Sequence, residues 1–273
     1  MENKAYPDIK HTVFLCLLFL GIQIAGGLIL GIIIGLKGQA GESFIFGLGT
    51  IFIFLLSFVV VILIGLKKSG KKFNDIILFN KVSSGVWLAV IIFMFGYIFI
   101  SSEIDNILNH FFPMPVFLQE TFKSMISNEY LIISVILVGI LPAFLEEFFF
   151  RGVVLSGFRQ NYTETKAILL SGFFFGFIHL NPYQFVTAFL IGIIMAYVLI
   201  KTNSILPAIY MHLFNNMVAV IVSRTEGLFV IQGFNTPYGE YSFQPWWINL
   251  IAMAFAAAGA WLFFKIIKKN EPT

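Results

Sequence analysis

Charged residues are scarce in this sequence. Asp, Glu, Lys and Arg make up 11% of the 273 residues, whereas hydrophobic residues make up 59%. A soluble globular domain has about 25% charged and roughly 45–50% apolar residues. A water-soluble protein of this size could not bury so much apolar surface. The composition therefore excludes an ordinary soluble domain and predicts an integral membrane protein.

Cysteine is nearly absent, because Cys16 is the only one in the chain. A single cysteine cannot form an intrachain disulfide, and it argues against a thiolate metal site. Polar stretches long enough for a separate soluble domain are also lacking, and no internal repeat is evident. We therefore expect residues 1–273 to form a single transmembrane domain.

Long apolar runs, in contrast, are abundant. A membrane-spanning helix needs about 20 mainly apolar residues at a rise of 1.5 Å per residue. Eight segments meet or approach this requirement, so we predict an all-α polytopic membrane protein, a bundle of about eight transmembrane helices. The expected helices cover residues 12–36, 44–66, 82–102, 130–158, 166–180, 184–200, 204–223 and 246–267.

The distribution of positive charge predicts the orientation of these helices. If the N-terminus is cytoplasmic and every segment crosses, only Lys37, Lys123 and Arg224 lie outside, and the other 14 of the 17 Lys and Arg residues are cytoplasmic. Positive charge is retained on the cytoplasmic side during insertion. We therefore expect a multi-pass cell-membrane protein with both termini cytoplasmic and an even number of crossings.

The longest connection between these segments covers residues 103–129 and carries aromatic and aliphatic residues among polar ones. This composition is compatible with an interfacial helix or a lid over a cavity, and equally with an ordered loop that rests on the bundle. In the expected topology it lies on the outer side, together with the segment around Gly233.

Two adjacent carboxylates, Glu146 and Glu147, lie in the fourth apolar segment. One Asp at a helix centre costs roughly 3 kcal/mol on insertion scales, so such groups should face the bundle interior and find partners. Glu147 and Arg151 are four residues apart and share a helix face, which predicts an ion pair. Glu146 is rotated by about 100° and remains the freer carboxylate, suited to act as a general base.

Polar side chains also occur in two later segments. His179 lies at the end of the fifth, and His212 and Asn216 share a face of the seventh because they are four residues apart. At 1.5 Å per residue, Glu146, His179 and Asn216 each lie about 18 Å from the cytoplasmic end of their helix, and His212 about 12 Å. The similar depths predict one shared cavity, open toward the cytoplasmic half.

Each of these features also has a purely structural explanation. A single intramembrane histidine is often a packing residue, Glu147 with Arg151 can join helices, and an asparagine commonly forms an interhelical hydrogen bond. Ionisable residues inside a membrane nevertheless mark functional sites by default. The complete set therefore favours a site over structural contacts.

The three patterns together resemble the motifs of a known family. They are similar to those of the CPBP family of intramembrane proteases, which includes CAAX prenyl endopeptidases and bacteriocin-processing or self-immunity proteins. The matching motifs are Glu146-Glu147-x-x-x-Arg151, Phe175-x-x-x-His179 and His212-x-x-x-Asn216. Each motif alone is weakly specific, whereas all three in this order on successive apolar segments are quite specific. The resemblance covers residues 140–220.

The resemblance implies an α-helical membrane protease with its catalytic helices at about residues 130–223. Peptide hydrolysis requires a base that takes a proton from water and donors that stabilise the oxyanion. The family pattern gives the motif residues three roles: water activation by Glu146 and His179, oxyanion stabilisation by His212 and Asn216, and support by Glu147 and Arg151.

A metal-dependent mechanism is equally compatible with these residues. A carboxylate with two imidazoles could bind one divalent ion such as zinc, which lowers the pKa of bound water. The ligands would be Glu146, His179 and His212. The resemblance also suggests a metal, since members of the family are often called metalloproteases. The sequence leaves open whether hydrolysis uses a metal ion or only Glu and His side chains.

Three functions compete at this stage. The leading hypothesis is an endopeptidase that cleaves a membrane-associated protein or peptide within the lipid bilayer, without a nucleic-acid partner. The second is a non-catalytic membrane immunity or scaffold protein, against which the intact motifs count. The third is a proton-coupled transporter, because Glu and His chains relay protons, although no inverted repeat supports it.

Overall fold

The computed structural model describes residues 4–37, 42–126, 130–225, 230–236 and 241–270. The chain is 82% helical, and no strand occurs in these ranges. The prediction of an all-α membrane protein is therefore confirmed.

The helices follow the apolar segments of the sequence. In chain order they are α1 (Ile9–Lys37), α2 (Glu42–Ser69), α3 (Phe73–Ile76), α4 (Ser84–Phe111), α5 (Val116–Ile126), α6 (Leu131–Ser134), η1 (Val135–Ile140), α7 (Leu141–Glu147), η2 (Phe148–Val154), α8 (Leu155–Asn161), α9 (Glu164–Phe177), α10 (Pro182–Thr202), α11 (Leu206–Val222) and α12 (Trp246–Asn270). The elements from α6 to α8 form one continuous central helix, Leu131–Asn161. Each expected segment thus forms a helix.

Six helices in the described ranges are long and apolar enough to cross a membrane: α1, α2, α4, the central helix, α10 and α12. The remaining two bundle helices are shorter, with 17 residues in α11 and 14 in α9. At 1.5 Å per residue they extend over about 26 Å and about 21 Å, less than the roughly 30 Å hydrocarbon core. The chain is a multi-pass membrane protein, and α9 and α11 are shorter than a typical hydrocarbon core is thick.

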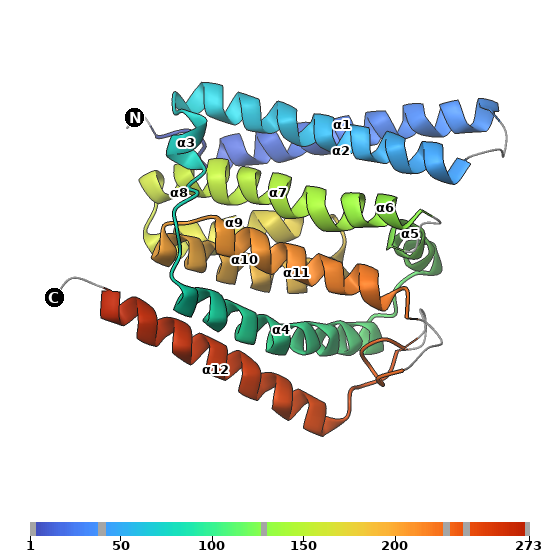
Figure 1. Ribbon diagram of the computed structural model, residues 1–273. Coiled ribbons are helices and arrows are strands. Elements are labelled where there is room, and N and C mark those ends of the chain that lie inside the picture. Colours follow the sequence, from blue (N-terminus) through green and yellow to red (C-terminus); the bar gives the residue numbers. More distant parts are fainter. Residues whose placement is uncertain (1–3, 38–41, 127–129, 226–229, 237–240, 271–273) are drawn as a thin grey trace.

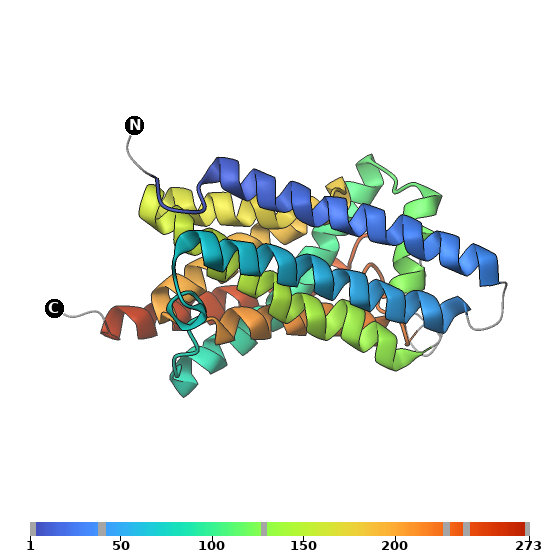
Figure 2. The same ribbon diagram turned by 90° about the horizontal axis from the view of Figure 1, so that it is seen from above.

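The helices are stacked in layers (Figure 1). The α1–α2 pair packs on the central helix, followed by α9, α10 and α11, then α4, with α12 on the far side of α4. Figure 2 shows α1 and α2 running side by side above the central helix. The beginning of α1 and the end of α12 lie at the same end of the bundle, called the termini end below. This arrangement agrees with an even number of crossings.

Glycines allow close helix contacts near the polar residues of the bundle. A Cβ added to Gly172 of α9 would lie 3.0 Å from the backbone nitrogen of Ile193 in α10. A Cβ on Gly192 would lie 3.0 Å from the Gly172 Cα. Small residues let backbones approach in this way in membrane bundles. The α9–α10 pair is therefore held tightly behind the central helix.

The described part of the connection at residues 103–129 is mostly helical, which agrees with a helix there and not with the alternative of an ordered loop. The helix α4 continues to Phe111, and α5 follows after a short break. Asn109 stabilises the break, because its Oδ1 accepts a hydrogen bond from the Met114 backbone nitrogen at 3.3 Å. Residues 127–129 lie outside the described ranges, and an interfacial position for α5 stays a prediction.

Two wide π-helical turns bracket α7, the part of the central helix that carries both carboxylates. They are η1 before it and η2 after it. Pro142 occupies the first turn of α7 and has no backbone N–H, so it cannot donate a normal helical hydrogen bond. Single π-helical turns within α-helices are frequent at functional sites.

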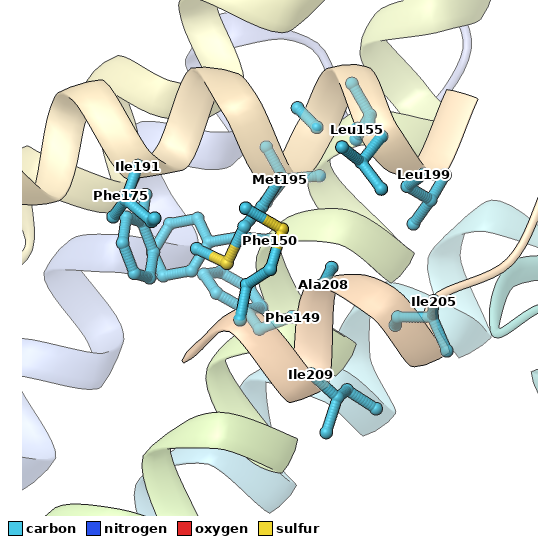
Figure 3. Close-up of a cluster of buried hydrophobic side chains, with 14 of the residues drawn as sticks. Phe149, Phe150, Leu155, Phe175, Ile191, Met195, Leu199, Ile205, Ala208 and Ile209 are labelled. Carbon is cyan, nitrogen blue, oxygen red and sulfur yellow. The ribbon is translucent and has the colours of Figure 1, made fainter. Parts of the chain in front are cut away.

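A cluster of buried hydrophobic side chains joins the central helix, α10 and α11 (Figure 3). It includes Phe149 and Leu155 of the central helix, Met195 of α10, Ile205 just before α11 and Ala208 of α11. All five side chains are buried, with at most 1% of their surface exposed. Aromatic and aliphatic side chains therefore fill the space between these helices.

Candidate active site

Arg151 and Glu147 form the predicted ion pair. The Arg151 Nη1 lies 3.0 Å from the Glu147 Oε1, and both side chains are fully buried. The Arg151 Nη2 also donates a hydrogen bond to the Gly192 carbonyl at 3.2 Å. The guanidinium carbon lies 4.2 Å from the centre of the Phe175 ring, a cation–π contact. Arg151 thus connects the central helix to α9 and α10.

His212 connects α11 to both carboxylates. Its Nδ1 lies 2.9 Å from the Glu147 Oε1, and its Nε2 lies 4.0 Å from the Glu146 Oε2. Glu147 is therefore shared between Arg151 and His212, an arrangement that the sequence does not predict. The Glu146 Oε2 is buried and accepts no hydrogen bond from the described residues, so Glu146 is the freer carboxylate, as predicted.

The turn after α9 fixes the position of His179. Leu180 adopts a left-handed backbone conformation with φ of 50°, which ends α9 and reverses the chain. Asn181 then caps α10, because its Oδ1 accepts hydrogen bonds from the Tyr183 and Gln184 backbone nitrogens at 3.0 and 3.4 Å. The imidazole is thereby held at the junction between two packed helices.

The Phe175 backbone orients the His179 ring. The His179 Nδ1 lies 2.9 Å from the Phe175 carbonyl oxygen. A carbonyl only accepts, so Nδ1 carries the hydrogen, and the Nε2 of the neutral ring is left with its lone pair. The Phe175 ring also contacts both imidazoles edge to face, with centroid distances of 5.6 Å to His179 and 5.4 Å to His212. Phe175 therefore touches three of the candidate residues.

Asn216 is fixed to the central helix. Its Nδ2 donates a hydrogen bond to the Val138 carbonyl in η1 at 2.9 Å, and its Oδ1 accepts one from Asn215 at 3.2 Å. An amide nitrogen has two hydrogens, so one remains available to another acceptor.

A cavity of about 130 Å³ lies beside these groups. Its polar lining comes from α4, α10, α11 and the end of α9: Tyr97, Ser101, Asp105, His179, Gln184, Thr187, His212, Asn215 and Asn216. His179, His212 and Asn216 share one cavity, as expected, whereas Glu146 does not line it. Only 7% of the Glu146 surface is exposed, and its carboxylate approaches the cavity next to His212.

The cavity lies toward the end of the bundle opposite the termini end. Asp105 is near the end of α4, His179 follows the end of α9, and Gln184 is in the first turn of α10. Most of the polar lining residues thus lie nearer the end opposite the termini, and the direction in which the cavity opens stays a prediction.

A family model matches this part of the chain. Residues 128–218 match the model described as type II CAAX prenyl endopeptidase Rce1-like. These residues, about a third of the chain, are called the Rce1-like domain below because of this similarity. The match confirms the resemblance expected from the three motifs. Neither the curated proteins nor the solved structures gave a match to the chain.

The Rce1-like domain contains all the motif residues and supports an intramembrane protease of the CAAX type. It runs from the start of the central helix into α11. The wall formed by Tyr97, Ser101 and Asp105 lies outside the matched residues, on α4.

The expected metal ligands of the Rce1-like domain do not converge. In the described residues, no group of three His, Cys, Asp or Glu side chains is arranged to hold a metal ion. The Nδ1 atoms of His212 and His179 are held by Glu147 and by a carbonyl oxygen, which leaves both Nε2 atoms available, but no hydrogen bond or ion pair joins Glu146 to His179 in those ranges. Glu146, His179 and His212 as placed here therefore do not fit a metal site.

The contribution of α4 is absent from the sequence-based prediction, which placed Asp105 outside the membrane-spanning segments. A signal exists, because Tyr97, Ser101 and Asp105 follow one another at intervals of four and share a helix face. The role of the Phe175 ring had no such signal, because a phenylalanine in an apolar segment resembles ordinary core.

Proposed function

We propose that this protein is an intramembrane endopeptidase that hydrolyses a peptide bond of a membrane-associated protein or peptide. One observation carries the proposal: the buried group of Glu146, Glu147, Arg151 and His212 adjoins a cavity lined by His179 and Asn216, within an Rce1-like domain. Buried ionisable residues of this kind are costly in a membrane and are typical of functional sites.

Water activation is the proposed role of Glu146 and His179. The Glu146 Oε2 has no hydrogen-bond donor among the described residues, and the Nε2 of neutral His179 has a free lone pair. Both groups can accept a proton from an attacking water molecule. Catalytic hydrogen bonds often tighten only when substrate binds, which allows the Glu146 carboxylate to reach a water molecule beside His212.

His212 and Asn216 are the proposed donors to the oxyanion. Asn216 has an amide hydrogen left after its hydrogen bond to Val138. His212 can donate from Nε2 in its doubly protonated form, which Glu147 stabilises from the opposite side of the ring. In that form the two carboxylates, Arg151 and His212 carry no net charge together. Donors held in place before reaction stabilise developing charge without reorganisation.

Arg151, Glu147 and Phe175 are positioning residues in this proposal. Glu147 orients His212, Arg151 holds Glu147, and the Phe175 carbonyl orients His179. Because these contacts orient the two imidazoles, loss of any of the three residues should act through the geometry of His179 or His212.

We further propose that both termini are cytoplasmic, from the distribution of Lys and Arg. The cavity then lies in the outer half of the membrane, since it is nearer the end opposite the termini. A substrate held in or on the outer leaflet would reach it most directly.

The proposal is tested by comparing membrane proteomes for new protein termini. Three strains are compared, which express the wild type, Glu146→Gln or Glu164→Gln. Glu164→Gln is the matched control, because it makes the same chemical change away from the site, where Glu164 pairs with Lys201 at the cytoplasm-facing ends of α9 and α10. New termini are expected with the wild type and Glu164→Gln, and not with Glu146→Gln at equal expression. The same termini in all three strains would contradict the proposal and favour a non-catalytic membrane partner.

A further inference from the structure

Asp105 is an unpaired acid in the wall of the cavity. Its Oδ1 is buried without a hydrogen-bond partner, and no Lys or Arg occurs among the lining residues of the described chain. Its neighbour on α4, Glu103, differs in this respect. The Glu103 carboxylate accepts hydrogen bonds from Asn106, Asn249 and the Gln244 backbone at 3.0, 3.1 and 2.9 Å. Burial of Asp105 without a partner is costly, so a positive group would be held strongly there.

The hydroxyl groups around Asp105 present acceptors to the cavity. Tyr97 donates its hydroxyl hydrogen to the Thr187 carbonyl at 2.9 Å, and Ser101 donates to the Ile98 carbonyl at 3.0 Å. Thr187 donates to the Gln184 carbonyl at 3.4 Å. With these hydrogens used, the hydroxyl oxygens can only accept hydrogen bonds from a ligand in the cavity. This side of the cavity is therefore rich in acceptors, which suits a group with several N–H donors.

We infer that Asp105 is the centre of a specificity subsite that binds a lysine or arginine side chain of the peptide substrate. The inference rests on the proposed protease function, because the subsite opens into the same cavity as His179 and His212. An ammonium or guanidinium supplies both the missing positive charge and the donors that the wall lacks. Asp105 lines the same cavity as the proposed oxyanion donors, His212 and Asn216, so the basic residue belongs to the part of the peptide that enters this cavity.

The experiment uses purified protein in phospholipid vesicles and a library of N-acylated peptides. Each position of the peptide holds Lys, Arg, norleucine, Gln or Glu in turn, and mass spectrometry gives the rate of cleavage. At one position, Lys or Arg should be cleaved at least about tenfold faster than norleucine, a factor expected from one charge-assisted contact. Asp105→Asn should reduce this ratio to below about threefold, whereas Asp105→Glu should retain it.

Glu103→Gln is the matched control, since it removes a neighbouring charge that does not line the cavity. It should retain the preference for a basic residue. An unchanged ratio in Asp105→Asn, or cleavage by the wild type without any basic preference, would overturn the subsite.

A binding measurement separates this inference from the protease function. In the Glu146→Gln background, the Lys peptide should bind at least about tenfold more tightly than its norleucine analogue, and Asp105→Asn should abolish the difference. If the wild type cleaves no peptide but this difference in binding is seen, the protease function fails and the subsite stands. Equal binding of both peptides would refute the subsite.

Discussion

Replacement of Arg151 by alanine tests the buried charge cluster. The change removes the ion pair with Glu147, the hydrogen bond to the Gly192 carbonyl and the contact with the Phe175 ring. The Glu147 carboxylate is then left with His212 as its single partner among the described residues. We expect a loss of stability together with a loss of activity.

The size of the effect follows from the complete burial of the pair. Removing one partner of a buried ion pair typically costs about 3–5 kcal/mol. The remaining contact between Glu147 and His212 should place the loss toward the lower part of this range. For a chain of this size, each kcal/mol shifts the melting temperature by about 2–4 °C, so a loss of about 3–4 kcal/mol should make Arg151→Ala melt roughly 6–16 °C below the wild type.

The assay is thermal unfolding in detergent, combined with peptide cleavage by the same preparations. Arg159→Ala is the control, because Arg159 is exposed on the same continuous helix, and it should melt like the wild type. Adding Glu147→Gln to Arg151→Ala removes the uncompensated charge and should restore part of the stability. Melting of Arg151→Ala within about 2 °C of the wild type would refute the reasoning, because it would mean that the pair carries little net energy.

Three further predictions use other parts of the structure. Glu146→Gln keeps the side-chain shape and should melt within about 2 °C of the wild type, while activity falls at least about 100-fold; early melting would make Glu146 a structural carboxylate. In intact cells, an impermeant maleimide should label Val230→Cys and not Lys72→Cys, and the reverse pattern would invert the topology. Gly96→Ala should destabilise the α4–α12 contact by about 1–3 kcal/mol, because its Cβ would meet the Ala252 carbonyl. Gly27→Ala is the control, since a Cβ there has open space, and equal melting of both variants would contradict this packing.

Hydrophobicity predicts the helices of this protein well, because lipid is their main solvent. The largest boundary error is at the end of α4, which continues to Phe111 rather than stopping at residue 102. Polar residues there resemble a loop in the sequence, but they face the protein interior. The Asn106 Nδ2, for example, donates a hydrogen bond to the Gly233 carbonyl after α11. Pairing of this kind depends on distant segments and has no local signal.

The candidate site shows the same division between local and long-range information. Helical spacing alone predicts the pair of Glu147 with Arg151, which the structure contains. The contact of Glu147 with His212 joins two helices that are far apart in the sequence, so spacing could not reveal it. The position of the cavity depends on which ends of the helices are filled by core side chains. The chemical roles of all these residues stay predictions.

Hydrolysis by the purified protein is the most direct test of the central claim. The substrate is a protein that the proteome comparison shows to be cleaved only in cells with the wild-type enzyme. It should be incubated with vesicles that contain either the wild type or Glu146→Gln, in water enriched in oxygen-18. Hydrolysis by an activated water molecule places one oxygen-18 atom in the new C-terminal carboxyl group. We predict labelled product from the wild type and at least about 100-fold less from Glu146→Gln. Equal labelled product from both proteins, or none from either, would contradict the account.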